Sequence, residues 1–242
     1  MTYILGARCP EGVVIVADNK VVYNNGDVRY ENKTYCNLSQ AVWAASGTRE
    51  DFGWFKDRLN PKIANEKMNK FELMRTTSDL IIEGRRKNET DEMELLLGIR
   101  AKPEMKSQLF YFNAGGGSQE IVEEKVIGQA EPVGRFFLKE YFKRDLPMFK
   151  VATLGTFIIK FIEKKKLDNT VGFGDKPPTI WWIPDLPDGY RSDADLPKGL
   201  MSAFVVRQEE SSEIEVFREP VDKMVDAWIG FNKKFFGDSF ET

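Results

Sequence analysis

The sequence of 242 residues contains no histidine. Histidine is the general base of Ser-His-Asp and Cys-His nucleophiles and a common metal ligand. Its absence excludes these catalytic classes, imidazole metal sites and every acid–base step that needs an imidazole. What remains for chemistry is a threonine or serine with an amine as base, a lysine, or carboxylates.

Cysteine is nearly absent as well: Cys9 and Cys36 are the only two, and neither has a partner at CxxC spacing. Because isolated thiolates do not match the spacing of a zinc site, we expect no metal, and we expect both cysteines to be reduced and structural. The run Gly115–Gly117 lacks the Gly-Lys-Ser/Thr ending of a phosphate loop and predicts a turn between strands. No cofactor is expected.

Strong charge and long apolar runs are also missing. The formal net charge is -3, which gives no field for nucleic acid or for a membrane surface. No run approaches the roughly 18 apolar residues of a membrane span, and the first residues lack a signal-peptide pattern. With 42% hydrophobic residues, we expect one cytoplasmic domain over residues 1–242, with an extended C-terminal part at about 176–242.

The first eighteen residues predict a β-hairpin. Strand-forming residues precede and follow the turn Pro10–Gly12. If Cys9 lies opposite Val13, then Ile4 lies opposite Asp18, and Thr2 is a diagonal neighbour of Asp18 on the same face, roughly 7–8 Å away.

This placement suggests a nucleophile with its own base. A threonine hydroxyl is a weak nucleophile, but an N-terminal threonine carries an α-amine with a pKa of about 7.7–8.0. The Lys33 ammonium beside Thr2 would favour the neutral amine by like-charge repulsion, and Asp18 would keep that lysine charged and in place. The condition is removal of Met1, which is compatible with the small second residue.

These residues resemble the start of a proteasome β-subunit. The resemblance rests on the segments 2–6 and 11–20 and on Lys33. It implies Thr2 as the nucleophile, Asp18 as the carboxylate partner and Lys33 as the lysine of the site. It also implies an oxyanion donor among the backbone N–H groups of 44–47, for which Gly47 is our candidate.

The resemblance extends to about residue 175, with departures. Asp168 in the sequence Leu-Asp-Asn-Thr-Val-Gly matches an aspartate that supports the terminal amine, although a plain turn residue after a helix is an equal alternative. Gln129 and Val171 stand where the family has two supporting serines. The expected fold is α+β, the four-layer αββα sandwich of N-terminal-nucleophile hydrolases.

Periodicity and turn signals place the other elements. We expect helices at about 48–60, ending at Asn60-Pro61, and at 71–86, 133–143, 149–166 and 220–236. In the third of these, Phe136, Phe137 and Tyr141 form the apolar side. Strands are expected at 28–35, 41–47, 94–99, 108–112, 120–127, 177–184, 203–206 and 213–217.

The leading hypothesis is a threonine endopeptidase that hydrolyses peptides or unfolded proteins. The resemblance implies a homo- or hetero-oligomeric ring and allows an ATPase regulator. Two alternatives stay open. A non-catalytic, ring-forming subunit is suggested by Gln129 and Val171, and an amidase or peptide ligase of narrower specificity could act through the same Thr2.

Overall fold

The computed structural model describes residues 2–23, 26–37, 41–65, 68–87, 92–100, 106–174, 178–185, 207–208, 223–227 and 229. The described strands fall into two five-stranded sheets and one short two-stranded sheet. The first sheet has the order β10-β1-β2-β11-β12, and its strands are Glu124–Ile127, Ile4–Cys9, Gly12–Ala17, Thr179–Pro184 and Arg207–Gln208. The second sheet has the order β5-β6-β7-β8-β9, and its strands are Thr34–Asn37, Ala41–Ser46, Glu94–Arg100, Ser107–Phe112 and Ser118–Ile121.

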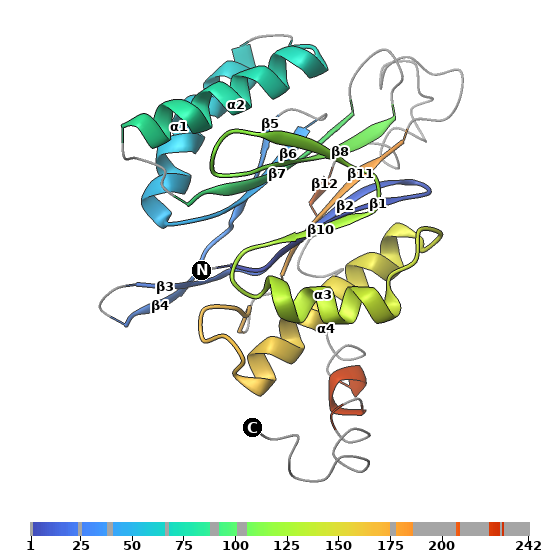
Figure 1. Ribbon diagram of the computed structural model, residues 1–242. Coiled ribbons are helices and arrows are strands. Elements are labelled where there is room, and N and C mark those ends of the chain that lie inside the picture. Colours follow the sequence, from blue (N-terminus) through green and yellow to red (C-terminus); the bar gives the residue numbers. More distant parts are fainter. Residues whose placement is uncertain are drawn as a thin grey trace.

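The two sheets face each other, and a pair of helices covers the outer face of each (Figure 1). Helices α1 (Arg49–Asn65) and α2 (Lys70–Arg86) pack on the second sheet, and α3 (Glu131–Tyr141) and α4 (Met148–Lys165) pack on the first. Alternating residues of β1 and β2 supply both the core between the sheets and the core under α3 and α4, as strand periodicity requires. The expected α+β class is confirmed.

The opening hairpin forms as expected, but its register differs by one residue. Cys9 lies opposite Gly12 and Ile4 opposite Ala17, so the turn contains only Pro10 and Glu11. A two-residue connection is the shortest common hairpin turn. The conditional register with Cys9 opposite Val13 is therefore wrong, and Asp18 lies next to Tyr3 instead of Ile4.

Helices α1 and α2 begin at reciprocal capping boxes. Thr48 Oγ1 accepts the Asp51 N–H at 3.1 Å, and Asp51 Oδ2 accepts the Thr48 N–H at 2.8 Å. Asn69 and Glu72 make the same exchange at the start of α2. The helix expected to end at Asn60-Pro61 in fact continues to Asn65, with Pro61 inside it. The Asn60 side chain is buried and accepts the Trp43 indole N–H at 3.1 Å.

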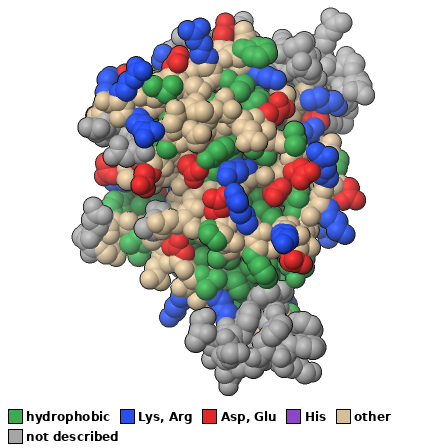
Figure 2. Space-filling model, in the orientation of Figure 1, with side chains coloured by type: hydrophobic (Ala, Val, Ile, Leu, Met, Phe, Trp, Pro, Cys, Tyr) green, Lys and Arg blue, Asp and Glu red, His purple; other side chains and the backbone are tan. Residues whose placement is uncertain are grey.

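The expected apolar side of α3 is only partly correct. Phe137 is buried and packs edge-on against Phe157 and Phe161 of α4. Phe136 and Tyr141 are 56% and 48% exposed. Figure 2 shows charged side chains of both signs interspersed over one face of the molecule, with hydrophobic side chains gathered near the α3 and α4 layer.

Two expected strands prove to be divided. The stretch 120–127 belongs to β9 and β10, which lie in different sheets, so the chain crosses from the second sheet to the first. The stretch 28–35 is divided between β4 (Val28–Tyr30), which pairs with β3 (Lys20–Val22), and β5. Lys33 therefore lies in the connection between two strands. Gly115–Gly117 forms the expected turn between β8 and β9.

The expected strands 203–206 and 213–217 lie outside the described residues. Within the expected helix 220–236, residues 223–227 and 229 are helical. Val225 is buried against the α4 side of the molecule, and Asp226 pairs with Lys164 of α4 at 2.7 Å. None of the helices in the described ranges has the length and apolar character needed to cross a bilayer. Cys9 is buried and has a free thiol, as expected, whereas the Cys36 side chain is outside the description.

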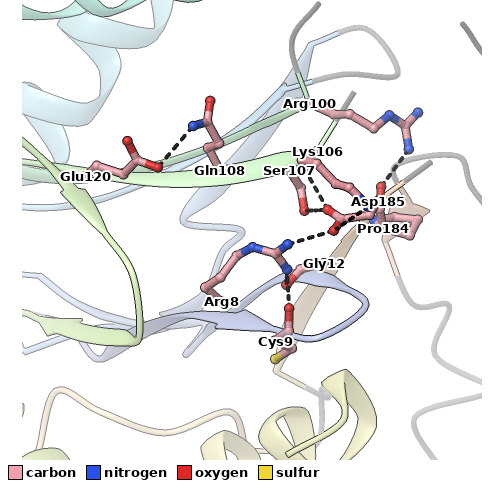
Figure 3. A network of polar contacts seen from close by, with 10 residues as sticks. All are labelled: Arg8, Cys9, Gly12, Arg100, Lys106, Ser107, Gln108, Glu120, Pro184 and Asp185. Carbon is pink, nitrogen blue, oxygen red and sulfur yellow. Dashed lines mark hydrogen bonds and ion pairs between the residues drawn. The ribbon is translucent and has the colours of Figure 1, made fainter. Parts of the chain in front are cut away.

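A polar cluster joins the two sheets at the turn end of the opening hairpin (Figure 3). The carboxylate of Asp185, just after β11, accepts the N–H and the hydroxyl of Ser107, both at 2.7 Å, and pairs with Arg8 at 2.6 Å. Buried Arg100 donates to the Pro184 carbonyl at 2.9 Å. Residues of β1, β8 and β11 are thus held together at this end of the sandwich.

Candidate active site

The structure brings Asp18 and Lys33 into a direct ion pair. Lys33 Nζ lies 3.0 Å from Oδ1 and 2.8 Å from Oδ2 of Asp18. The exposed fraction is 9% for the Lys33 side chain and 0% for the Asp18 side chain. Little water therefore reaches the pair, and its interaction is much stronger than that of a surface ion pair.

Backbone groups from two other segments hold the Asp18 carboxylate. The Tyr3 N–H donates to Oδ1 at 2.8 Å, and the Gly172 N–H also donates to the carboxylate. In return, the Asp18 N–H donates to the Tyr3 carbonyl at 3.0 Å. The carboxylate is thereby attached to the residue directly after Thr2.

Burial perturbs both members of the pair. Burial raises the pKa of Asp18 above its ordinary value, while Lys33 and the N–H groups of Tyr3 and Gly172 act in the opposite sense. Burial lowers the pKa of Lys33 below its ordinary value, and Asp18 counteracts this most strongly. Asp168 also acts to raise the pKa of Lys33, so its carboxylate lies within electrostatic reach of the ammonium.

The connection that carries Lys33 is fixed by its neighbours. Asn32 Oδ1 accepts the N–H and the hydroxyl of Thr34, at 2.9 Å and 2.6 Å. The Trp181 indole donates to Thr34 Oγ1 at 2.7 Å, and the Thr179 hydroxyl donates to Asn19 Oδ1 at 2.8 Å. These contacts attach the connection to β11, so the lysine is held in place although it is outside a strand.

Thr2 is buried at the open end of β1, with 3% of its surface exposed. Gly128, in the turn after β10, approaches it closely, because a Cβ at Gly128 would lie 2.0 Å from the Thr2 carbonyl oxygen. The φ angle of Gly128 is +98°, a conformation that favours glycine. A residue without a side chain therefore allows the β10 turn to pack against the backbone of Thr2.

Gly47, the candidate oxyanion donor, follows the last residue of β6. The β6 strand runs beside the Lys33 connection, where the Ala45 N–H donates to the Lys33 carbonyl at 3.5 Å. Ser46 Oγ lies 3.4 Å from the position that a Cβ on Gly128 would occupy. The end of β6 thus lies at the same end of the sandwich as Thr2, and the capping box of α1 fixes the backbone just after Gly47.

The loop after α4 carries Asp168 and a hydroxyl that the sequence interpretation missed. Thr170 donates to Asp168 Oδ1 through its hydroxyl at 2.5 Å and through its N–H at 2.8 Å. Val171, at the position where the family resemblance implies a supporting serine, is fully buried. A hydroxyl is therefore present one residue earlier, next to the expected carboxylate. Gln129 lies in the turn after Gly128 and is exposed.

Other residues of the site gave no signal in the sequence interpretation. Asn19, Asn32, Thr34 and Thr179 form the polar contacts beneath the Lys33 connection. Asn and Thr are frequent in turns and strands, and only the pairing of β11 with β2 brings them together. One feature of the sequence could have indicated them: polar residues flank Lys33 on both sides, which is unusual for the strand expected there.

The sequence matches no protein-family model and no curated protein. Solved structures similar to it include three Anbu chains. The Gly-1 mutant of Anbu from Hyphomicrobium sp. strain MC1 has a TM-score of 0.75 at 17% identity, with 97% of each chain covered. Anbu from the same strain has a TM-score of 0.72 at 17% identity, with 96% of this chain and 97% of that chain covered.

The third structure is Anbu, described as an ancestral beta-subunit, from Yersinia bercovieri. Its TM-score is 0.64 at 14% identity, with 74% of this chain and 79% of that chain covered. At these identities the likeness shows the fold alone. The sequence-based resemblance to proteasome β-type proteins is confirmed at that level, over nearly the full length of the chain.

Proposed function

We propose that the protein is a threonine endopeptidase of the proteasome β type, which is an N-terminal-nucleophile hydrolase. Its two sheets, each covered on the outside by a pair of helices, then form the αββα sandwich of that class. The observation that carries this proposal is the buried Asp18–Lys33 pair, attached through the Tyr3 N–H to the residue after Thr2. A lysine buried with a carboxylate beside a threonine is the arrangement that an amine-assisted hydroxyl nucleophile requires.

In the proposed reaction, removal of Met1 first frees the Thr2 amine. Thr2 Oγ attacks the carbonyl carbon of a peptide bond as its proton passes to this amine. The Lys33 ammonium keeps the amine neutral beforehand, because two positive charges in proximity repel. Asp18 holds the lysine charged.

A backbone N–H near Gly47 would stabilise the oxyanion that forms. The tetrahedral intermediate then collapses: the C–N bond breaks, and the leaving amine takes the proton from the Thr2 ammonium. The acyl group remains as an ester on Thr2. Water then gives a proton to the Thr2 amine as it attacks the ester carbon. The bond between this carbon and Thr2 Oγ breaks, the ammonium returns the proton to Oγ, and the second product leaves with a new carboxyl group.

Peptides or unfolded proteins are the proposed substrates, and a homo- or hetero-oligomeric ring is the proposed assembly. Both follow from the family resemblance of the sequence, and the likeness to Anbu structures supports only the fold that they require. Asp168, which accepts a hydrogen bond from Thr170, is proposed to help keep Lys33 protonated.

The test compares wild-type protein with Thr2→Ala and Thr2→Ser. Intact mass spectrometry first establishes whether Met1 is absent and whether a threonine-directed electrophile adds one equivalent at the N-terminus. We expect Thr2→Ala to lose the adduct and peptide cleavage, and Thr2→Ser to keep part of both. Thr77→Ala, the same change at a buried threonine of α2, is the control. Equal activity of Thr2→Ala and wild type would refute the proposal.

A non-catalytic ring subunit is the second candidate, favoured by Gln129 and Val171 at the places of the two supporting serines. It predicts oligomers in solution but neither turnover nor adduct. Thr2-dependent cleavage of any peptide would exclude it. An amidase or ligase of narrow specificity is distinguished by a substrate panel, since broad peptide cleavage counts against it.

A further inference from the structure

The loop after α4 contacts the segment that carries Asp18 through the backbone of a single residue, Gly172. The Gly172 N–H donates to the Asp18 carboxylate. The Gly172 carbonyl accepts the N–H groups of Asn19 and Lys20 at 3.2 Å and 3.1 Å, directly after Asp18 in the chain. The position of the carboxylate therefore depends on where this loop lies.

Glu163 of α4 holds the same loop from its other side. Its Oε1 accepts the Gly174 N–H at 3.0 Å. A Cβ at Gly172 would lie 2.5 Å from this oxygen, so the Gly172 backbone packs directly against the carboxylate. At a φ of +153°, this position combines a close approach with a conformation that suits glycine.

Lys160 fixes the other oxygen of Glu163. The distance from Lys160 Nζ to Glu163 Oε2 is 3.1 Å, and the side chains are 13% and 20% exposed. Lys160 Nζ also lies 4.9 Å from the centre of the Phe173 ring, which is part of the loop. This pair is far more shielded than Lys87–Glu83 on α2, whose side chains are 54% and 46% exposed. Shielding and two-sided contact give Glu163 one defined geometry.

We propose that Glu163 is a positioning residue of the active site, which fixes the loop at Gly174 and Gly172 and thereby orients Asp18 and the Lys33 ammonium. The inference rests on the proposed function, because it gives the pair a role in the reaction at Thr2. Among the described residues, the charged groups that act on the pKa of Lys33 are Asp18 after β2, Asp168 in the loop after α4 and Lys20 of β3. Glu163 acts on them through the peptide groups of the loop.

The experiment uses the full chain with Glu163→Ala and Glu163→Gln. Glu83→Ala, which removes a glutamate from an exposed ion pair of α2, is the control. For each protein, kcat and KM for a peptide substrate are measured across pH. Hydrogen exchange of the peptide covering residues 167–174 is followed by mass spectrometry.

We expect Glu163→Ala to lower kcat about 10- to 100-fold with little change in KM, because small misplacement of a reacting group is costly. The acid side of its kcat–pH profile should move to higher pH. A misplaced Lys33 ammonium lowers the pKa of the Thr2 amine by a smaller amount, so the amine becomes neutral only at higher pH. Exchange in 167–174 should become faster. Glu163→Gln keeps an acceptor for the Gly174 N–H and should recover most of kcat, and Glu83→Ala should behave as wild type.

Three results would overturn the inference: Glu163→Ala with the kcat, acid limb and exchange of the control; equal losses in the Ala and Gln variants; or a change in KM alone. Failure of the proposed function looks different. In that case Thr2→Ala is as active as wild type, and hydrogen exchange alone then decides whether Glu163 holds the loop.

Discussion

Lys33 Nζ contacts both carboxylate oxygens of Asp18, at 3.0 Å and 2.8 Å, in a part of the molecule from which water is nearly excluded. Removing two charges from water is expensive, and their attraction repays the cost only when further hydrogen bonds complete the site. The N–H groups of Tyr3 and Gly172 supply such bonds to Asp18. Stability and activity should therefore respond differently when the pair is altered.

The first prediction concerns the stability of the pair. Lys33→Met should lower the free energy of unfolding by about 3–5 kcal/mol, because it leaves a buried carboxylate without its counter-charge. Adding Asp18→Asn should recover most of this loss, since the amide oxygen still accepts the N–H groups of Tyr3 and Gly172. Urea unfolding of the single and double variants measures both. Independent, additive losses would contradict the coupling.

The second prediction concerns the alkaline side of the pH profile for reaction at Thr2. Burial lowers the pKa of Lys33, so the ammonium loses its proton below the ordinary lysine pKa of about 10.4. The rate of Thr2 modification by an electrophile should fall in that range, because the neutral lysine no longer stabilises the negative charge that develops on Thr2 Oγ as its proton leaves. Asp18→Asn removes the charge that counteracts burial, so its alkaline limb should lie at lower pH than that of wild type. A limb that moves to higher pH would contradict this assignment.

The third prediction is a loss of activity in Gly128→Ala. The added Cβ would lie 2.0 Å from the Thr2 carbonyl oxygen, and φ at this position is +98°. The turn must move away from Thr2, and we expect kcat/KM to fall about 100-fold. Gly53→Ala is the control, because nothing lies within 4 Å of a Cβ at that helical position. Comparable rates for both variants would show that the turn does not set the place of Thr2.

The fourth prediction separates the polar cluster around Asp185 from the site. Asp185→Ala should lower the free energy of unfolding by about 1–3 kcal/mol, because Ser107 and Arg8 lose their acceptor. Lys106→Ala, which removes a half-exposed lysine 3.9 Å from the same carboxylate, should change it by no more than about 1 kcal/mol. Neither variant should shift the pH profile at Thr2. A shift would show that the cluster is coupled to the site.

The sequence was sufficient for local features and for the opening segment. The capping box at Thr48, the hairpin around Pro10 and the helices of the second half follow from rules that involve neighbouring residues. The proximity of Asp18 and Lys33 was expected from the family resemblance, and the ion pair agrees with it. The hairpin register was missed because Pro10-Glu11-Gly12 permits turns of two or three residues.

The sequence did not predict features that depend on contacts between distant segments. The split of 120–127 between two sheets is decided by which neighbour each half finds, and both halves have strand-like residues. The continuation of α1 through Pro61 is accompanied by a buried hydrogen bond between Asn60 and Trp43, a contact between segments that no local rule predicts. The hydrogen bond from the Thr170 hydroxyl to Asp168 was not predicted, because the family resemblance directs attention to position 171 and not to its neighbour.

The place of β1 inside its sheet has a consequence for how the protein folds. Its residues pair with Gly12–Ala17 on one side and with Glu124–Ile127 on the other, and the second partner is more than a hundred positions away along the chain. Such non-local pairing is slow to form. During synthesis Thr2 and Asp18 leave the ribosome long before Gly128 and Gly172, so the contacts that surround them form only once this later sequence is available.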